Sequence, residues 1–515
     1  MACGHIRTTC SDKISFHWSS LPDRCVYSGW ECAIVTPEFD LVIRNGTVVT
    51  AADVVQCDVG IKNGKISAIA ERLPVSASDI DASDLFVMPG GIDSHVHIAQ
   101  DSPDAKMADD FATGSRSAAA GGNTTFIPFV VQPRGASLRQ CVEDYHQLAA
   151  GQCHVDYGFH LIITDPSSVV LGQELPALVR DGYTSFKVFM TYDDMVLNDR
   201  QILEVFDCAR RERALVMVHC EGYDTIKFMT ERLETQARTQ PFFHAVSRPE
   251  PIEREATHRA ISFSELIDVP IMIVHVSGRE AMEQVRWAQQ KGLKIYAETC
   301  PQYISLTADD LKGIGAPEAG GKYVCSPPPR DHDSWEAIWE GLRLGVFSTF
   351  SSDHCPFYYD SPVGKLSPKG KQSFRWIPNG IPGVETRMQI LFSEGVVKGR
   401  ITLEQFVALT STNHAKMYGL YPQKGSIAVG CDADIAIWDP RSKHTITQSA
   451  LHHGSDYTPW EGFEVTGCVV KTILRGRVIF DRANDSVLNS APAGEFMKRK
   501  FSAYAAPQPH ITSAE

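Results

Sequence analysis

The sequence predicts an α/β fold, in which a (β/α)8 barrel of the TIM type carries a small β-sandwich domain built from both terminal segments. The barrel is predicted because short apolar runs alternate with amphipathic helical stretches between residues 89 and 419. The sandwich is predicted because short alternating strands occur at 39–88 and return only at 420–487. We expect the remaining residues, 1–38 and 488–515, to form an N-terminal extension and a C-terminal tail.

Composition limits the classes of protein to which this chain can belong. With 515 residues, of which 43% are hydrophobic, the chain is long enough for two domains and too apolar to be disordered. Its formal net charge of -13 disfavours nucleic-acid or anionic-membrane partners, and its apolar runs are shorter than the roughly 20 residues that a bilayer requires. The 14 cysteines show no paired spacing and follow no secretory signal, so we expect a cytoplasmic protein.

Two Asn-Gly pairs mark the predicted β-domain near the N-terminus. Asn45-Gly46 and Asn63-Gly64 each interrupt a strand-like run, and this dipeptide accepts the positive φ angles of a two-residue turn. We therefore expect a hairpin at each pair. Similar short strand-like runs at 427–438 and 469–480 predict the strands that complete the domain.

The barrel is predicted to begin after Pro89-Gly90-Gly91, where the chain leaves the β-domain. Two helix starts carry capping-box signals, Ser277 with Glu280 and Thr402 with Gln405. Further barrel strands are predicted at four apolar runs, 184–189, 215–219, 271–276 and 293–297.

Potential metal ligands stand at the predicted strand ends. His95 and His97 alternate along the first barrel strand, so both side chains face one side and can bind the same metal ion. Because the strand ends of a barrel converge at one mouth, we expect these histidines and the later strand-end residues to form one active site. The later strand-end residues are Lys187, His219, His275 and Asp353.

Eight motifs between residues 90 and 383 give the chain a specific resemblance, which extends from about residue 39 to about residue 481. In them it resembles the dihydropyrimidinase and D-hydantoinase (phenylhydantoinase) family of cyclic amidohydrolases. The motifs read Gly90-Gly-Ile-Asp-Ser-His-Val-His97, Phe186-Lys-Val-Phe-Met-Thr-Tyr192, Val218-His-Cys-Glu-Gly222, Val274-His-Val-Ser277, Glu298-Thr-Cys-Pro-Gln302, Ser326-Pro-Pro328, Ser352-Asp-His-Cys-Pro356 and Asn379-Gly-Ile-Pro-Gly383.

The resemblance implies two Zn²⁺ ions per subunit, bridged by a hydroxide and by Lys187 carbamylated on its amine. Carbamylation has a physical reason, because a free ammonium would repel two cations, whereas a carbamate is an anion with two oxygens that can bridge them. In the implied ligand set, one ion is held by His95, His97 and Asp353 and the other by His219 and His275.

The resemblance also implies hydrolysis of a small cyclic ureide or imide. The hydroxide would attack a ring carbonyl, Tyr192 would stabilise the oxyanion, and Asp353 would move the proton to the leaving ring nitrogen. Ser326 and Asn379 would bind the amide-imide edge of the substrate. The expected reactions convert a 5,6-dihydropyrimidine to an N-carbamoyl-β-amino acid, or a 5-substituted hydantoin to an N-carbamoyl amino acid. Members of the family are usually homotetramers or homodimers.

Three other functions are associated with this fold. A dihydroorotase would carry an arginine two residues after the histidine pair, where this chain has Ala99. An allantoinase stays open as an alternative. The loops at 98–106 and 189–197 would surround the ring substituent, and their residues, Asp101 among them, do not determine which substituent is bound. A non-catalytic scaffold would have lost the metal ligands, whereas all six are present here.

Overall fold

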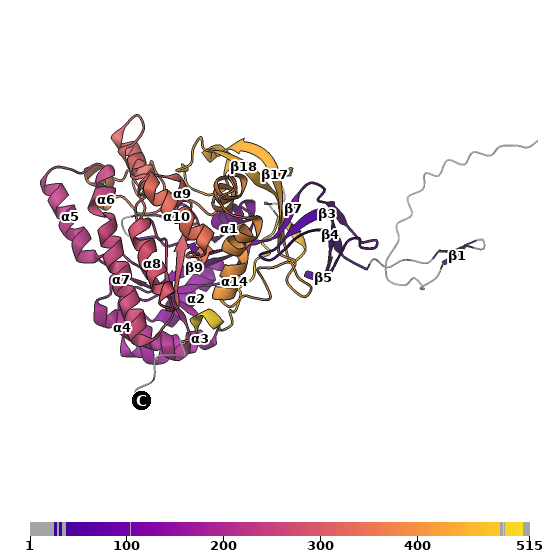
Figure 1. Ribbon diagram of the computed structural model, residues 1–515, viewed down its shortest axis with the longest axis horizontal. Helices are drawn as coiled ribbons and strands as arrows, with labels where there is room; N and C mark the ends of the chain where they lie inside the picture. Colours follow the sequence, from indigo (N-terminus) through magenta and orange to yellow (C-terminus); the bar gives the residue numbers. More distant parts are fainter. Residues whose placement is uncertain are drawn as a thin grey trace, which may run out of the picture.

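The computed structural model describes residues 38–102, 105–484, 488 and 490–507, and the backbone of two short strands, β1 (Cys25–Tyr27) and β2 (Trp30–Cys32). β1 and β2 pair antiparallel, and the rest of the predicted extension at 1–37 lies outside the described residues. Figure 1 shows helices surrounding one unit of the molecule, with a β-rich unit beside it. These are the barrel and the terminal β-domain of the predicted fold.

A parallel sheet forms the barrel, and its strand order follows the chain. Adjacent strands pair in the order β8, β9, β11, β12, β13, β14, β15, β16. The short strand β10 pairs with an earlier part of β9 than β11 does. A parallel bridge between Val96 and His354 connects the segment after β16 back to the first strand, which confirms the predicted barrel. The strands are β8 (Gly91–Val96), β9 (Asn123–Val131), β10 (Asp156–Tyr157), β11 (His160–Ile162), β12 (Ser185–Phe189), β13 (Leu215–His219), β14 (Ile271–Ile273), β15 (Ile295–Thr299) and β16 (Thr349–Phe350).

Helices follow the strands and cover the outside of the barrel (Figure 1). The longer helices each bury an apolar stripe, as α4 does with Ile202, Val205 and Phe206. The helices are α1 (Phe111–Ala120), α2 (Leu138–Ala149), α3 (Leu175–Arg180), α4 (Asp199–Glu212), α5 (Tyr223–Thr235), α6 (Phe242–Ser247), α7 (Glu250–Ile267), α8 (Arg279–Gln290), α9 (Gln302–Ser305), α10 (His332–Leu344), α11 (Pro368–Gln372), α12 (Arg387–Leu391), α13 (Leu403–Val407) and α14 (Asn413–Met417).

One of the two predicted capping boxes is present. Helix α13 begins after Thr402, which exchanges the expected pair of hydrogen bonds with Gln405. The capping box predicted at Ser277 is wrong, because the N-cap of α8 is Gly278 and makes no side-chain cap. Ser277 instead donates its N–H and its hydroxyl to the buried carboxylate of Glu253 on α7. A partner from another helix has replaced the local cap.

Strands from both ends of the chain form one mixed sheet, in the order β19, β18, β17, β7, β3, β4, β5, with β6 paired to β3. β7 joins the two halves, since it pairs antiparallel with β17 and parallel with β3. Ile43, Ile61, Ile435 and Ile473 belong to one buried cluster, so both halves share a core as predicted. The strands are β3 (Leu41–Val49), β4 (Val54–Lys62), β5 (Lys65–Ala70), β6 (Asp79–Asp81), β7 (Phe86–Pro89), β17 (Ile435–Thr445), β18 (Glu464–Leu474) and β19 (Arg477–Asp481).

The two Asn-Gly pairs have different structural roles. Asn63 and Gly64, with φ angles of 51° and 74°, turn the chain between β4 and β5 as predicted. The hairpin predicted at Asn45-Gly46 is wrong, because β3 runs on through both residues and its register with β4 shifts there. Strands pair with β3 on both of its sides. They hold it extended, so the positive φ of Asn45 produces a bulge rather than a turn.

The described residues of the C-terminal tail pack across the amino ends of the barrel strands. The Met497 N–H donates to the Tyr157 carbonyl at 2.7 Å, and Lys294, just before β15, donates to the Ala506 carbonyl at 2.7 Å. Arg499 is only 4% exposed. The tail therefore covers the end of the barrel opposite to the strand ends that carry the predicted ligands. Within the part of the chain that the structure describes, no helix is both long and apolar enough to cross a membrane.

Candidate active site

A cavity of about 730 Å³ lies at the carboxyl ends of the barrel strands, where enzymes of this architecture have their active sites. All of the site residues predicted from the sequence line it. They are His95, His97, Lys187, Tyr192, His219, His275, Ser326, Asp353 and Asn379. The fold thus brings the predicted set into one place.

His95, His97 and Asp353 form a group that could hold one metal ion. One ligand atom of each lies within 4.8 Å of the others. The Oδ1 atom of Asp353 is 3.2 Å from Nε2 of His95 and 3.6 Å from Nε2 of His97. His95 lies in β8 and His97 one residue beyond it, so the alternation of the strand places both imidazoles on one side.

Lys187, His219 and His275 lie next to this group. Lys187, in β12, is fully buried, and its Nζ is 3.5 Å from Nε2 of His95. His219 ends β13 and His275 follows β14, with their ring centroids 4.4 Å apart. The His275 ring is also 5.4 Å from that of His95, so both sets of potential ligands share one space.

Two buried carboxylates that the sequence analysis did not assign to the site hold the imidazoles. Oε1 of Glu298 is 2.6 Å from Nδ1 of His95, and Oε2 of Glu221 is 2.8 Å from Nε2 of His219. Such a bond fixes the tautomer of the ring and leaves its other nitrogen for a metal ion. Both glutamates stand in the motifs that carry the family resemblance, and this position was their only signal in the sequence.

Burial sets the charge states of the site. It lowers the pKa of the imidazoles of His95, His219 and His275, which are then neutral, the form that binds metals. Burial also lowers the pKa of the Lys187 amine and raises that of the Glu298 carboxyl. A lysine with a lowered pKa is more often in its neutral amine form, which can react with carbon dioxide.

Four residues that line the cavity have left-handed backbone conformations: Ala99, with a φ angle of 51°, and three predicted site residues. The φ angles are 72° at Tyr192, 41° at His275 and 51° at Asp353. A residue other than glycine in this region costs on the order of 1–3 kcal/mol and persists only where its surroundings hold it. Strain gathered at three predicted site residues is therefore independent structural support for a functional role.

The donor set fits the implied metal centre. Four imidazoles, one carboxylate and a buried lysine offer the nitrogen and oxygen ligands that suit Zn²⁺. Nδ1 of His275 is buried and has no hydrogen-bond partner among the described residues, as expected for a nitrogen placed in a ligand set.

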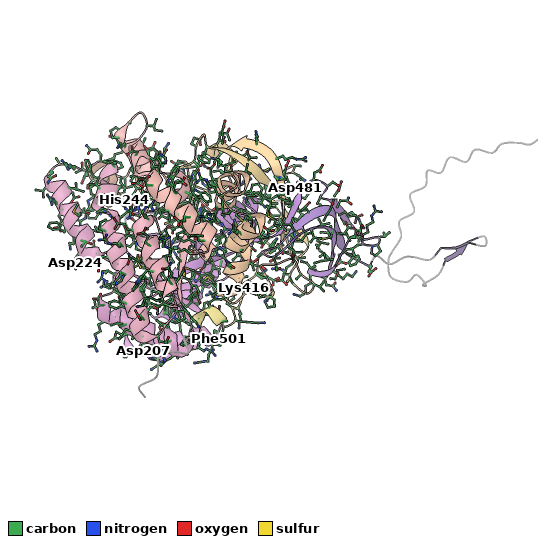
Figure 2. All side chains as sticks on the ribbon, viewed as in Figure 1. Asp207, Asp224, His244, Lys416, Asp481 and Phe501 are labelled. Atoms are coloured by element: carbon green, nitrogen blue, oxygen red, sulfur yellow. The ribbon has the colours of Figure 1, made fainter. Side chains whose placement is uncertain are left out.

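The cavity also carries polar groups suited to a small substrate, and one of them, the Tyr192 ring, lies 5.3 Å from the ring of His219. Burial raises the pKa of the Tyr192 phenol well above its usual value, so the phenol keeps its proton and can donate it. Oγ of Ser326 is 3.3 Å from Nε2 of His244, a residue of α6 labelled in Figure 2. Oδ1 of Asn379 is buried without a partner among the described residues. These three residues can therefore bind a polar ring.

The loops predicted to surround the ring substituent do line the cavity, with Ala99, Asp101 and Ser102 from the first loop and Phe189 at the start of the second. Gln100 has a further contact that the sequence did not reveal. Its Oε1 lies 2.9 Å from Nδ1 of His97, which fixes that imidazole as the glutamates fix those of His95 and His219.

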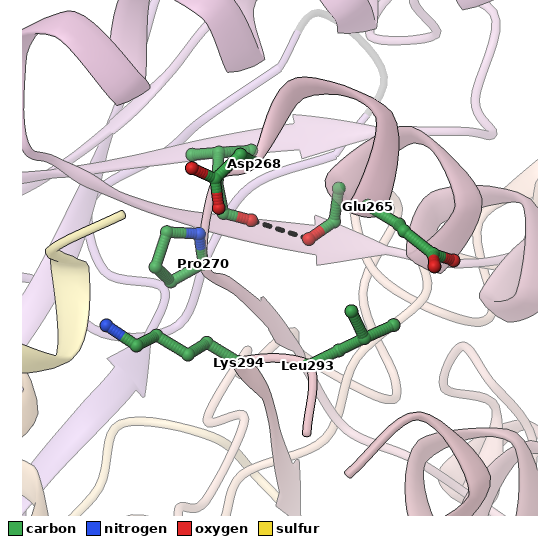
Figure 3. A pocket seen from close by; sticks show the side chains of 7 residues that line it. Glu265, Asp268, Pro270, Leu293 and Lys294 are labelled. Carbon is green, nitrogen blue, oxygen red and sulfur yellow. Dashed lines mark hydrogen bonds between the residues drawn. The ribbon is translucent and has the colours of Figure 1, made fainter. Parts of the chain in front are cut away.

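A second pocket lies at the opposite end of the barrel, before β14 and β15 (Figure 3). Glu265, Asp268, Pro270, Leu293 and Lys294 are among its lining residues, and its volume is about 10 Å³. It has room for no more than a water molecule and does not compete with the cavity at the strand ends as a substrate site.

A barrel with imidazoles, a lysine and an aspartate at its strand ends defines a metal-binding hydrolase. The model of the amidohydrolase family matches residues 86–479. The chain is 42% identical to a D-hydantoinase of Ralstonia pickettii over 90% of its own length and 99% of that relative. Among solved structures, a D-hydantoinase has a TM-score of 0.86 at 42% identity, covering 90% of this chain and 100% of the other. A dihydropyrimidinase from Brevibacillus agri has a TM-score of 0.86 at 40% identity, covering 90% and 99%. The chain belongs to the amidohydrolase family, in its branch of hydantoinase and dihydropyrimidinase type, and is an enzyme.

Proposed function

We propose that this enzyme hydrolyses the cyclic amide bond of a small cyclic ureide or imide with the help of two zinc ions. The observation that carries the proposal is that the metal-binding group and the three polar substrate-side residues line one cavity. The proposed substrates are a 5,6-dihydropyrimidine, which yields an N-carbamoyl-β-amino acid, or a 5-substituted hydantoin, which yields an N-carbamoyl amino acid. The relatives reported above, named for hydantoins and dihydropyrimidines, support this class of substrate.

The proposed ligands divide into two sets with Lys187 between them. His95, His97 and Asp353 would hold one ion, and His219 and His275 the other. Bound there, two divalent cations would lower the pKa of water and polarise an amide carbonyl. Lys187, carbamylated on Nζ, would supply the anionic bridge that its buried position and its contact with His95 allow.

The side chains of the chain itself would hold the substrate and move the proton. Ser326 and Asn379 bind the planar amide-imide edge. The phenol of Tyr192 donates to the oxygen on which negative charge develops. The carboxylate of Asp353 accepts a proton from the attacking water and delivers it to the departing ring nitrogen, which would otherwise leave as an unstable amide anion.

Substitution of Lys187 tests the bridging role. We expect Lys187→Ala to lose bound zinc and all measurable turnover, because both sets of ligands lose their shared anion. Zinc content by elemental analysis and ring opening of a hydantoin measure the two effects. Zinc content and activity equal to those of the unmodified enzyme would contradict the role.

The choice of substrate is tested by following the ring opening of dihydrouracil, 5-phenylhydantoin and allantoin by the zinc-loaded enzyme, with and without a chelator. Turnover of dihydrouracil or of the substituted hydantoin that the chelator abolishes supports the proposal. Preference for allantoin would favour the allantoinase alternative. If none of the three rings opens while zinc is bound, the metal site stands but the proposed substrate class is wrong.

The oligomeric state and the cellular location of the enzyme are further proposals. An assembly of four or two identical chains would be measured by light scattering of the purified protein. A cytoplasmic location accords with the free thiols of the described cysteines, for example Cys220 and Cys468, and would be tested by cell fractionation.

A further inference from the structure

A buried lysine outside the metal centre connects the two segments that carry the substrate-side residues. Lys365, in the segment between β16 and α11, is fully buried. Its Nζ donates to the carbonyl of Val324 at 2.8 Å and to the carbonyl of Pro378 at 2.9 Å. Among the described residues no carboxylate forms an ion pair with this amine, and the titratable groups acting on it, Cys325 and Cys355, are thiols whose pKa burial raises, so they are neutral.

The two carbonyls stand next to residues with a proposed role in substrate binding. Val324 precedes Ser326 by two residues, and Pro378 is bonded directly to Asn379. A hydrogen bond from the Gly380 N–H to the Val324 carbonyl, at 3.1 Å, also joins the segments. The Val324 carbonyl therefore accepts from both Gly380 and Lys365, at a place where neither segment belongs to a sheet.

The Ser326 segment is also held from its other side. Nε2 of His244 lies 2.9 Å from the Cys325 carbonyl, and burial lowers the pKa of this imidazole, which keeps it neutral. His244 fixes one segment only. Lys365 is bonded to both segments, so it fixes the position of one relative to the other.

A lysine is a costly residue for filling a buried space. Burial lowers the pKa of Lys365 to about 7, which reflects the free energy needed to keep a charge away from water. A methionine would fill a similar volume without that cost but could donate no hydrogen bond. The feature that distinguishes the lysine is thus its capacity to bind two carbonyls at once.

We infer that Lys365 is a positioning residue, which sets the distance between the backbone segments of Ser326 and Asn379 by holding the carbonyls of Val324 and Pro378. The inference rests on the proposed function, in which Ser326 and Asn379 bind the edge of the ring. Lys365 itself touches neither the substrate nor the metal ligands. Its loss should therefore weaken substrate binding and leave the chemical step intact.

The test is a comparison of steady-state kinetics for Lys365→Met and for Lys371→Met, a matched control at an exposed lysine of α11. Loss of two hydrogen bonds should raise KM for the preferred ring about tenfold or more, with kcat within about threefold and zinc content unchanged. Lys371→Met should match the unmodified enzyme. A side chain that serves only to fill space would not separate KM from kcat in this way.

A second variant keeps the inference testable if Lys365→Met does not fold with its zinc. Lys365→Gln retains a donor on a shorter side chain, so we expect it to raise KM by an intermediate factor. A zinc-loaded Lys365→Met enzyme, or failing that Lys365→Gln, with KM within twofold of the unmodified enzyme would overturn the inference. If the unmodified enzyme opens none of the rings, the proposed function has failed instead.

Discussion

Oε1 of Glu298 lies 2.6 Å from Nδ1 of His95, and both side chains are almost fully buried inside the barrel. Glu298 belongs to β15 and His95 to β8, which are not neighbours in the sheet, so the hydrogen bond crosses the interior of the barrel. It leaves Nε2 of His95 free to approach Asp353, at 3.2 Å, and Lys187, at 3.5 Å. The position of the first proposed ligand thus depends on a residue 203 positions away in the chain.

Replacing the carboxyl group of Glu298 should selectively weaken the binding of one metal ion. We expect Glu298→Gln to lower zinc affinity at the His95 set by about 10- to 100-fold, the usual effect of losing a carboxylate behind a ligating imidazole. Zinc retained per subunit across a chelator series measures it. Glu221→Gln, the matched change behind His219, should weaken the other ion. Equal zinc retention by Glu298→Gln and the unmodified enzyme would contradict the role of this contact.

The phenol of Tyr192 should contribute to rate and not to metal binding. Phenylalanine accepts the same backbone strain and leaves only the hydroxyl missing, so Tyr192→Phe should keep both zinc ions. If the phenol stabilises the oxyanion, kcat should fall by roughly 100-fold or more. Tyr223→Phe, which removes a hydroxyl bonded to Asp193 in the neighbouring loop, serves as the control. Unchanged kcat in Tyr192→Phe would remove the residue from the mechanism.

The ligands at the strand ends could be predicted from the sequence because the barrel itself determines where they lie. His219 ends one parallel strand and Lys187 lies in another. Because the carboxyl ends of all barrel strands meet at one mouth, the two side chains are expected to lie close together whatever the details of packing. Glu298 and Lys365 could not be found in this way. Their roles depend on contacts across the barrel and between loops, and no local spacing encodes such contacts.

Local signals failed where a distant partner competed with them. The sequence around Ser277 has the spacing of a capping box, but Glu253 of another helix takes both donors of Ser277. Asn45 has the same neighbour, glycine, as Asn63, yet it lies in a strand that is paired on both sides, and the chain continues as a bulge. Both errors have one cause, which is that tertiary pairing outweighs a local preference of about 1 kcal/mol.

Arg499 should stabilise the fold although it lies in the C-terminal tail. Its Nη1 donates to Oγ of Ser185 at 2.7 Å, and its other terminal nitrogen donates to the Phe159 carbonyl at 2.5 Å, both at the amino end of the barrel. Hydrogen bonds to charged groups contribute about 1.5–3 kcal/mol each, so Arg499→Ala should lower the free energy of unfolding by roughly 3 kcal/mol. Urea denaturation measures the change. Lys498→Ala, at an exposed neighbouring residue, should have little effect. Equal midpoints for the two variants would show that the tail contributes nothing to stability through Arg499.

His414 gives the stability of the fold a defined dependence on pH. Its ring is fully buried, with Nδ1 2.8 Å from Oγ of Ser94 and Nε2 2.9 Å from the Leu409 carbonyl. These contacts suit a neutral ring that accepts from the hydroxyl and donates to the carbonyl. Burial lowers the pKa of His414 from 6.5 to about 3. In the unfolded chain His414 binds a proton below about pH 6.5, whereas in the folded chain it binds one only near pH 3. The stabilisation is therefore complete above pH 6.5 and is lost as the pH falls toward 3.

Replacing His414 should flatten this dependence. His414→Gln keeps an amide that can donate to the Leu409 carbonyl but has no group that titrates in this range. Between pH 6 and pH 4, the free energy of unfolding should fall less steeply in the variant, by up to about 1.4 kcal/mol for each pH unit. Urea denaturation of both proteins without metal keeps zinc dissociation from contributing. Parallel curves for the two proteins would mean that the folded chain protonates His414 as readily as the unfolded chain does, and that the buried ring is not held neutral.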